Sequence, residues 1–442
     1  MNTLYLEIAV VVLGILLLMV EAYSSSANKA RLAWIGAIGL FGVLILSFLP
    51  QHAPAPGSSA AAFVTSDLLS VFFVRLILAA TIVFLLTIPS FFPVLRRSLP
   101  AEREGGGLAE FAILPVFVCA GLMWMVSAVD FIMIFVSLEL ATITLYILAT
   151  YLRQNTDSLE SGTKFLILGA LSTGFIVYGI SWLFGTTGTT NLLALPSAIA
   201  ALPEAALTPL LFGIGMILVA LSFKISAFPF QFWVPDVYQG APTPVTSYLS
   251  VASKAAGFVV LIRLLGALWA IPAVSHQLHV VITLLAALTL IFGNFAAIPQ
   301  TNMKRLLGYS SVAHAGYLLM AVASLGSKMA VPAIGFYFAG YLAMTMLSFV
   351  VLQVVSGATG GDEISRFNGL GRRSPLLAGA MLLAAASLAG IPFTAGFIGK
   401  LLVFEVALKQ GHYGLVMLGC VTVAAGFYYY FKVIRAMYWQ QP

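Results

Sequence analysis

The sequence predicts an all-α polytopic membrane protein, and three observations lead to this fold class. Of the 442 residues, 61% are hydrophobic and only 8% are charged, whereas a soluble domain carries about 25% charged residues. Long apolar runs separated by short polar connections recur along the whole chain. Lys and Arg gather in alternate connections, as expected when cytoplasmic loops are basic. Together these observations exclude a soluble enzyme, a disordered chain and a nucleic-acid binder.

The apolar runs have the length of membrane-spanning helices, which need about 20 residues each. Thirteen spans are predicted, at 4–22, 32–50, 66–92, 110–127, 130–151, 164–185, 206–227, 243–268, 277–298, 303–324, 330–355, 375–406 and 413–437. The first run lacks a basic leader and a small-residue cleavage site. It is therefore interpreted as a spanning helix rather than as a cleaved signal peptide.

Two of the predicted spans contain helix-breaking residues. The run at 375–406 is too long for one straight helix and contains the sequence AGIP at 389–392, while the run at 206–227 leads into FP at 228–229. Gly and Pro interrupt helices, and neighbouring groups or water then satisfy the freed backbone. Both spans are predicted to be helices that are interrupted within the membrane.

The basic residues predict the orientation of the chain. If the N-terminus lies outside, thirteen basic residues fall inside: Lys29, Arg31, Arg96, Arg97, Arg103, Arg153, Lys304, Arg305, Arg366, Arg372, Arg373, Lys432 and Arg435. Only Lys328 and Lys409 fall outside. Because cytoplasmic loops carry the excess of Lys and Arg, this distribution predicts an external N-terminus and, with an odd number of spans, a cytoplasmic C-terminus.

Four charged residues lie inside apolar runs and are explained by neither loops nor span ends: Glu139, Lys224, Lys254 and Lys400, with His314 as a fifth titratable group. A charge at the membrane centre costs about 2.5–3.5 kcal/mol on insertion scales. Such residues pair with one another or line a hydrated path, and proton relays are a common reason for them. Lys suits proton transfer because, unlike Arg, it releases its proton when buried. We therefore predict a proton path through these five residues.

Simpler interpretations stay open at this point. Glu139 and Lys224 can form a structural ion pair, and His314 can be a hydrogen-bonded packing residue. Three further basic residues near span ends can snorkel to the interface, namely Lys164, Arg75 and Arg263. Lys164 is kept as a weaker candidate for proton transfer. Cys119 and Cys420 lie in apolar runs without metal-ligand spacing, so both are predicted to be core residues.

The spacing of the candidates suggests an internal repeat. Glu139 precedes Lys224 by 85 residues, and His314 precedes Lys400 by 86. In each pair the first residue is on a continuous span and the lysine is on an interrupted one. Helices 4–8 and 9–13 would then form two inverted five-helix repeats, a design of transporters. The predicted organisation is three N-terminal helices at 1–104, a first half at 105–270 and a second half at 271–442.

Several long motifs carry a resemblance to a known family: SLELATITLYILATYLR (137–153), TKFLILGALSTGFIVYGISWLFGTTG (163–188), the segment 223–258, QTNMKRLLGYSSVAHAGYLLM (300–320), SLAGIPFTAGFIGK (387–400) and GFYYYFKVIRAMY (426–438). Over about 105–438 the chain resembles the antiporter-like membrane subunits of respiratory complex I, and specifically the subunit N type. The link WVPDVYQGAP followed by Lys254 is similar to subunit N, since subunits L and M have a His on the following helix.

The resemblance implies a proton-translocating subunit of an NADH:quinone oxidoreductase with about 14 helices, in a bacterial inner membrane. Glu139 matches the family glutamate on helix 5, and Lys224, Lys254 and Lys400 match the lysines on helices 7, 8 and 12. The implied partners are the M and L type subunits, small membrane subunits and lipid. The chain has no GxGxxG, Walker, HExxH or cysteine-cluster motif. We therefore expect no cofactor or metal in this chain. NAD, FMN, iron–sulfur clusters and quinone are expected in partner subunits.

Three departures from the family pattern keep alternatives open. Gln231 stands where the family usually has a His, Phe393 stands where a second Pro often follows GIP, and a final helix after the YYY segment is expected but not found before Pro442. An Mrp-type cation/proton antiporter subunit and a membrane-bound hydrogenase-type subunit are alternatives. A structural membrane-arm subunit that no longer pumps is a third, because Gln231 cannot titrate.

Overall fold

The computed structural model describes residues 2–23, 31–55, 57–98 and 107–441, and Lys29 and Arg103 of the orientation argument lie outside these ranges. The chain divides into two compact units. The first unit comprises Met1–Ile225 and Ala252–Leu278, and the second comprises Ser226–Val251 and His279–Pro442. The predicted division into 1–104, 105–270 and 271–442 stays a prediction.

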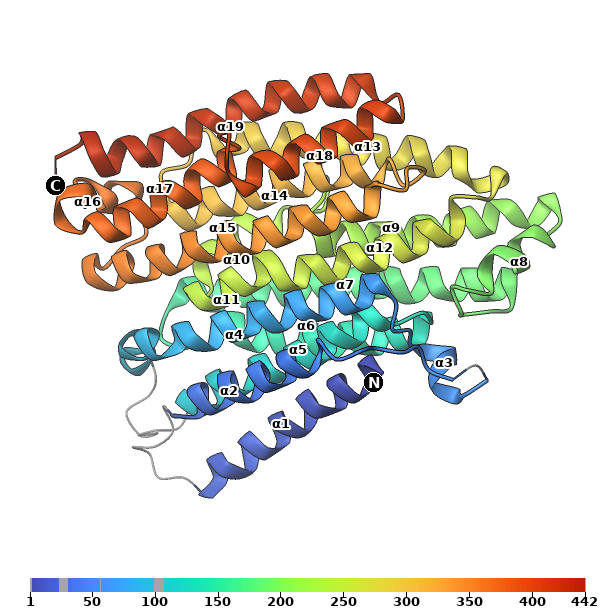
Figure 1. Ribbon diagram of the computed structural model, residues 1–442, viewed down its shortest axis with the longest axis horizontal. Helices are drawn as coiled ribbons and strands as arrows, with labels where there is room; N and C mark the ends of the chain where they lie inside the picture. Colours follow the sequence, from blue (N-terminus) through green and yellow to red (C-terminus); the bar gives the residue numbers. More distant parts are fainter. Residues whose placement is uncertain (1, 24–30, 56, 99–106, 442) are drawn as a thin grey trace. The chain divides into compact units, whose positions relative to one another are not determined.

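The first unit is built from helices that pack side by side (Figure 1). Its elements are α1 (Thr3–Tyr23), α2 (Arg31–Leu46), α3 (Ser59–Phe63), α4 (Leu68–Arg97), α5 (Leu108–Ser127), α6 (Phe131–Ala149), α7 (Thr156–Thr187), α8 (Leu195–Ala200), the 3₁₀ turn Glu204–Ala206, α9 (Leu207–Ile225) and α12 (Lys254–Leu268). Helices α7 and α9 pack closely at two glycines, because a Cβ atom on Gly179 would lie 2.7 Å from the carbonyl oxygen of Gly213.

The second unit contains the remaining helices. Its elements are α10 (Trp233–Gly240), α11 (Thr243–Tyr248), most of α13 (Pro272–Ala297), α14 (Met303–Val322), α15 (Ala330–Thr359), the 3₁₀ turn Ile364–Phe367, α16 (Leu370–Arg373), α17 (Pro375–Ala389), α18 (Ala395–Lys409) and α19 (Tyr413–Trp439). Helix α15 packs against α11, α14, α17 and α18, so it lies at the centre of this unit.

The predicted spans are confirmed as helices. Among the described residues, ten helices are long and apolar enough to cross a membrane. The shorter apolar helices α2 and α17, together with the 20-residue α14, account for the other three predicted spans.

The prediction that both cysteines are core residues is only half right. Cys119 is buried, but Cys420 is exposed, because α19 buries one face and Cys420 lies on the other.

Both predicted helix interruptions are confirmed. Helix α9 ends at Ile225 and the next helix begins at Trp233, while α17 ends at Ala389 and α18 begins at Ala395. Within the second break Gly390 has φ +89° and Phe393 has φ +70°. Proline holds φ near −65°, so the family-type proline would not fit the backbone conformation found at Phe393.

The Pro-rich link after α9 contains the short helices α10 and α11. Helix α11 continues into α12 through a π-helical segment, Leu249–Ser253. Lys254 is the first residue after this segment. Short π segments inside helices are rare and frequently lie at functional sites.

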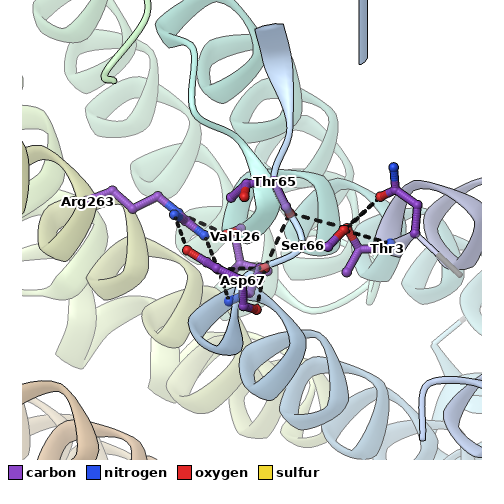
Figure 2. A network of polar contacts seen from close by, with 8 residues as sticks. Thr3, Thr65, Ser66, Asp67, Val126 and Arg263 are labelled. Atoms are coloured by element: carbon purple, nitrogen blue, oxygen red, sulfur yellow. Dashed lines mark hydrogen bonds and ion pairs between the residues drawn. The ribbon is translucent and has the colours of Figure 1, made fainter. Parts of the chain in front are cut away.

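One end of the first unit is held by an ion pair. Figure 2 shows Arg263 of α12 reaching Asp67, which precedes α4, and the Val126 carbonyl of α5. The two guanidinium nitrogens lie 2.9 Å from the Asp67 carboxylate oxygens, and Nη2 donates to the Val126 oxygen at 3.0 Å. Asp67 also caps α4 by accepting from the Ser70 N–H at 2.8 Å. Burial opposes ionisation, but the Arg263 hydrogen bonds and charge and the Ser70 N–H lower the pKa of Asp67 below its ordinary value.

Replacing Asp67 by Asn is expected to lower the thermal unfolding midpoint of the detergent-solubilised chain. Asn is itself a good helix cap, so the change removes the charge opposite Arg263 and keeps the cap. Because the pKa of Asp67 is lowered in the folded chain, its stabilisation is present above the ordinary carboxyl pKa and is lost only as the pH falls through the folded pKa.

The difference in midpoint between the wild type and Asp67→Asn should therefore stay constant from about pH 8 to about pH 5. Glu405→Gln is the control, because Glu405 and Lys409 form an exposed i,i+4 pair of a kind that contributes little. Equal midpoints for Asp67→Asn and the wild type would show that the ion pair does not hold this end of the unit.

Candidate functional site

Glu139 of α6 and Lys224 of α9 are brought close together in the first unit, because Lys224 binds α6 one turn from Glu139. The Lys224 side chain, 7% exposed in the last turn of α9, donates to the Thr142 hydroxyl at 2.8 Å. Thr142 follows Glu139 by three residues, so the two lie on one face of α6. Glu139 accepts a hydrogen bond from the Thr173 hydroxyl of α7 at 2.8 Å. Each charged side chain is thus hydrogen-bonded to a threonine, and the threonine that binds Lys224 is one turn from Glu139.

Lys254 is the third charged residue of the first unit. It is 1% exposed and begins α12, which packs against α9. Gly257, one turn further along α12, faces Lys224: a Cβ atom on Gly257 would lie 3.2 Å from Lys224 Cγ. The glycine therefore lets α12 approach the lysine side chain of α9, and the structure brings the helices of Lys224 and Lys254 into direct contact.

Lys400 lies at the interrupted helix of the second unit. Its ammonium group donates to the carbonyl oxygens of Leu388 at 2.9 Å and Ala389 at 2.8 Å, which are the last residues of α17. The last carbonyls of a helix have no partner within the helix and carry a partial negative charge. The break in the span therefore provides the acceptors that a buried lysine needs, and the Lys400 ammonium also lies 5.0 Å from the centre of the Tyr317 ring.

His314 lies in a group of buried tyrosines. Its Nδ1 is 2.7 Å from the Tyr337 hydroxyl of α15, and its Nε2 is 3.3 Å from the Tyr430 hydroxyl of α19. Ser310, one turn earlier on α14, is hydrogen-bonded to Tyr430. Tyr317, one turn later, contacts Lys400. Helix α14 therefore connects His314 to Lys400 through aromatic side chains with hydroxyl groups.

The basic residues near span ends are bound at their helix surfaces. Lys164 forms a 2.6 Å ion pair with Glu160 one turn away, with side chains 40% and 63% exposed. Arg75 donates to the Ser47 carbonyl at 2.6 Å and lies over the Phe48 ring. The structure places Lys164 in an exposed pair of ordinary type, apart from the buried lysines.

The link between α9 and α11 is held by ion pairs of its own. Asp236 pairs with Arg305 at 2.7 Å, and Lys304 pairs with Asp362 at 3.3 Å and donates to the Ala241 carbonyl at 3.1 Å. Asp236 is therefore a structural residue that joins the link to α14. Gln231 is fully buried in the same link, and neither its amide oxygen nor its nitrogen has a hydrogen-bond partner.

Sequence reasoning missed the neutral partners of the charged groups. Thr142, Thr173, Tyr337 and Tyr430 all bind a predicted residue, but none of them has a charge that marks it within an apolar run. Thr142 and Tyr317 had a usable signal, because each follows a predicted residue by three positions and helical spacing puts such residues on one face. Within the described ranges, no group of three or more His, Cys, Asp or Glu residues could hold a metal ion.

The amino-acid sequence matches a known family of membrane proteins over most of its length. Residues 128–426 match the transmembrane family described as NADH:quinone oxidoreductase/Mrp antiporter. NADH-quinone oxidoreductase subunit N of Trichlorobacter lovleyi is 39% identical over 442 residues, which is 100% of this chain and 88% of that protein. All four charged candidates and His314 lie within the matched family region.

The fold is also similar to solved structures. A chain of respiratory complex I from Thermus thermophilus with bound aureothin is similar with a TM-score of 0.80 at 31% identity, covering 99% of this chain and 90% of that one. A chain of the Mrp complex from Dietzia gives a TM-score of 0.81 at 20% identity, covering 99% and 80%. The predicted fold class, that of an all-helical antiporter-like membrane subunit, is thereby confirmed.

Replacing Gly390 by Ala is expected to destabilise the chain by about 1–2 kcal/mol through its left-handed backbone conformation and to displace Lys400. A Cβ atom there would lie 3.1 Å from Lys400 Cδ and 3.3 Å from Nζ. Thermal unfolding in detergent measures the effect. Gly379→Ala is the matched control in α17, because nothing lies within 4 Å of a Cβ atom at that position. Two variants with the same midpoint would contradict this account of the break.

Proposed function

The chain belongs to the NADH:quinone oxidoreductase/Mrp antiporter family of membrane subunits, and from this premise we propose that it is the proton-translocating subunit N of an NADH:quinone oxidoreductase. The observation that carries the proposal is the pairing of a buried lysine with an interrupted span in two places, at Lys224 and at Lys400. The 39% identity to a subunit N over the whole chain supports the subunit type.

The contacts around Lys224 suggest how one half of the path works. Its Thr142 partner is one turn from Glu139, so a change in the charge of Glu139 alters the electrostatic environment of the ammonium group. A nearby carboxylate favours the charged lysine, and its neutralisation favours release of the proton. Electron transfer in partner subunits would drive this change, and the proton would pass through Lys254 and His314 to Lys400.

The contacts around Lys400 suit the terminal position. Carbonyl oxygens accept hydrogen bonds from the charged lysine but do not neutralise it, so the site holds an ammonium group without a permanent ion pair. His314 and its tyrosine partners can each donate or accept a hydrogen bond. A lysine that is held in this way can release its proton when the charge nearby changes.

The proposed setting is a bacterial inner membrane, with the N-terminus outside and the C-terminus in the cytoplasm, next to the M and L type subunits and small membrane subunits. NAD, FMN, iron–sulfur clusters and quinone are assigned to partner subunits. An Mrp-type or hydrogenase-type assembly is the alternative, which the shared fold alone does not separate. Purification of the tagged chain from its own membranes distinguishes them, since flavin- and iron–sulfur-containing partners that oxidise NADH support the proposal.

Removing the lysine charge is expected to stop proton translocation by this subunit. In membrane vesicles, Lys224→Ala and Lys400→Ala should lower the number of protons moved per electron while the complex stays assembled. Lys400→Arg should do the same, because Arg keeps the charge but does not release its proton. Lys409→Ala is the control on the same helix, α18, since Lys409 is exposed and paired with Glu405. Unchanged pumping in the Lys224 and Lys400 variants would identify a structural subunit.

The Thr142 hydroxyl is expected to set the position of Lys224. Thr142→Val keeps the shape but removes the hydroxyl, and a hydrogen bond to a charged group contributes about 1.5–3 kcal/mol. We expect a several-fold lower pumping rate at normal assembly. Thr142→Ser retains the hydroxyl and should pump like the wild type. The proposal for this threonine would be wrong if Val and Ser gave the same rate.

A further inference from the structure

Glu7 is a buried carboxyl group that the proposed proton path does not use. It lies one turn into α1, within the first predicted span, and its side chain is 0% exposed. Neither of its carboxyl oxygens has a hydrogen-bond partner. A polar group that is buried without a partner is costly, and a buried charge without one costs much more. Such a residue therefore needs an explanation.

Two polar side chains of α5 lie beside the Glu7 carboxyl group, Trp124 and Ser127. The Trp124 indole N–H and the Ser127 hydroxyl are also buried and have no hydrogen-bond partner of normal geometry. Four unsatisfied polar atoms thus meet between α1 and α5. They are two carboxyl oxygens, one obligatory donor and one hydroxyl that donates and accepts.

The charged groups on the surrounding elements do not offset a charge on Glu7. The helices that pack on α1 are α2 and α5. Their charged residues, Arg31 and Glu110, lie in the first turns of these helices. Glu110 is fourteen residues from Trp124 on α5, which is about 21 Å along a helix. Helix α2 begins at the opposite end from Glu7, because its Gly36 packs near Leu17 of α1.

The nearest ion pair is engaged elsewhere. Asp67 and Arg263 bind each other, as Figure 2 shows. The segment that leads to Asp67 joins the two helices next to Glu7: the Thr65 N–H donates to the Ser127 carbonyl at 2.8 Å, and the Thr3 N–H donates to the Ser66 hydroxyl at 3.0 Å. The carboxyl group therefore lies beside hydrogen-bonded backbone, and within the part of the chain that the structure describes it has no ion-pair partner.

We propose that Glu7, Trp124 and Ser127 form a proton-binding site, separate from the Lys and His path, in which Glu7 is a neutral carboxylic acid bridged by one water molecule to the indole N–H and the hydroxyl. The neutral acid is favoured because no cation among the described residues forms an ion pair with Glu7, and an uncompensated carboxylate is costly to bury. A buried water needs two to four polar partners, and these three side chains supply them. Thr3, Ser66 and Thr65 close the site by joining the start of α1 to the end of α5.

The test compares the full-length wild type with Glu7→Gln, which resembles the neutral acid in size and hydrogen bonding. Equilibrium unfolding in detergent is measured at pH 6, 7 and 8. The folded wild type holds a proton that the unfolded chain releases in this range, so its stability falls with rising pH. Relative to Glu7→Gln, its unfolding constant should rise by up to about tenfold per pH unit.

Two further measurements complete the test. Assembled complexes with Glu7→Gln should pump as many protons per electron as the wild type. The infrared band of a protonated carboxyl group should be present in the wild type, absent in Glu7→Gln and shifted in Trp124→Phe. A difference in unfolding constant that does not change with pH would show that Glu7 is ionised and would overturn the proposal. Failure of Glu7→Gln to assemble or to pump would overturn it as well, since a neutral isostere should fit this site.

Discussion

A lysine ammonium in an apolar interior must have hydrogen-bond acceptors, and this requirement organises both units of the protein. At Lys400 the acceptors are the end carbonyls of α17, which are free only because the span is interrupted at Gly390. At Lys224 the acceptor is a hydroxyl on α6, and α12 approaches the lysine stem only because Gly257 has no side chain. The helix breaks and the close contacts at glycines therefore allow charged side chains inside the protein, and the remaining helices form the apolar surroundings of these side chains.

The charged residues and the breaks could be predicted from the sequence because both are local signals. A lysine within an apolar run has no ordinary reason to be there, and the sequence AGIP does not continue a helix. Their partners could not be predicted in the same way. Tyr337 reaches His314 from the following helix and Tyr430 from a helix 116 residues later, and Thr142 binds Lys224 of another helix although it lies beside Glu139. Only tertiary packing determines which hydroxyls face the charged groups.

The differences from expectation have a similar origin. Cys420 and Glu7 both lie in apolar helices, where composition says nothing about which face a residue occupies. Cys420 is on the open face of α19, whereas Glu7 points into the contact between α1 and α5. The conformation at Phe393 was not apparent either, because a phenylalanine after GIP carries no signal for a left-handed backbone. In each case the sequence gives the residue type but does not predict the direction of its side chain or its backbone conformation.

The π-helical segment before Lys254 changes the angular phase of its helix. Each residue of an α-helix turns the chain by about 100°, and a π segment accommodates one residue beyond the α-helical repeat. Such a segment therefore shifts by about 100° the face on which each later residue of the same helix lies. Arg263 and Gly257 follow on the same rigid α12 and inherit this offset. Because Lys254, Gly257 and Arg263 share one helix, a rotation of α12 about its axis would move the buried lysine, the contact of Gly257 with α9 and the ion pair with Asp67 together.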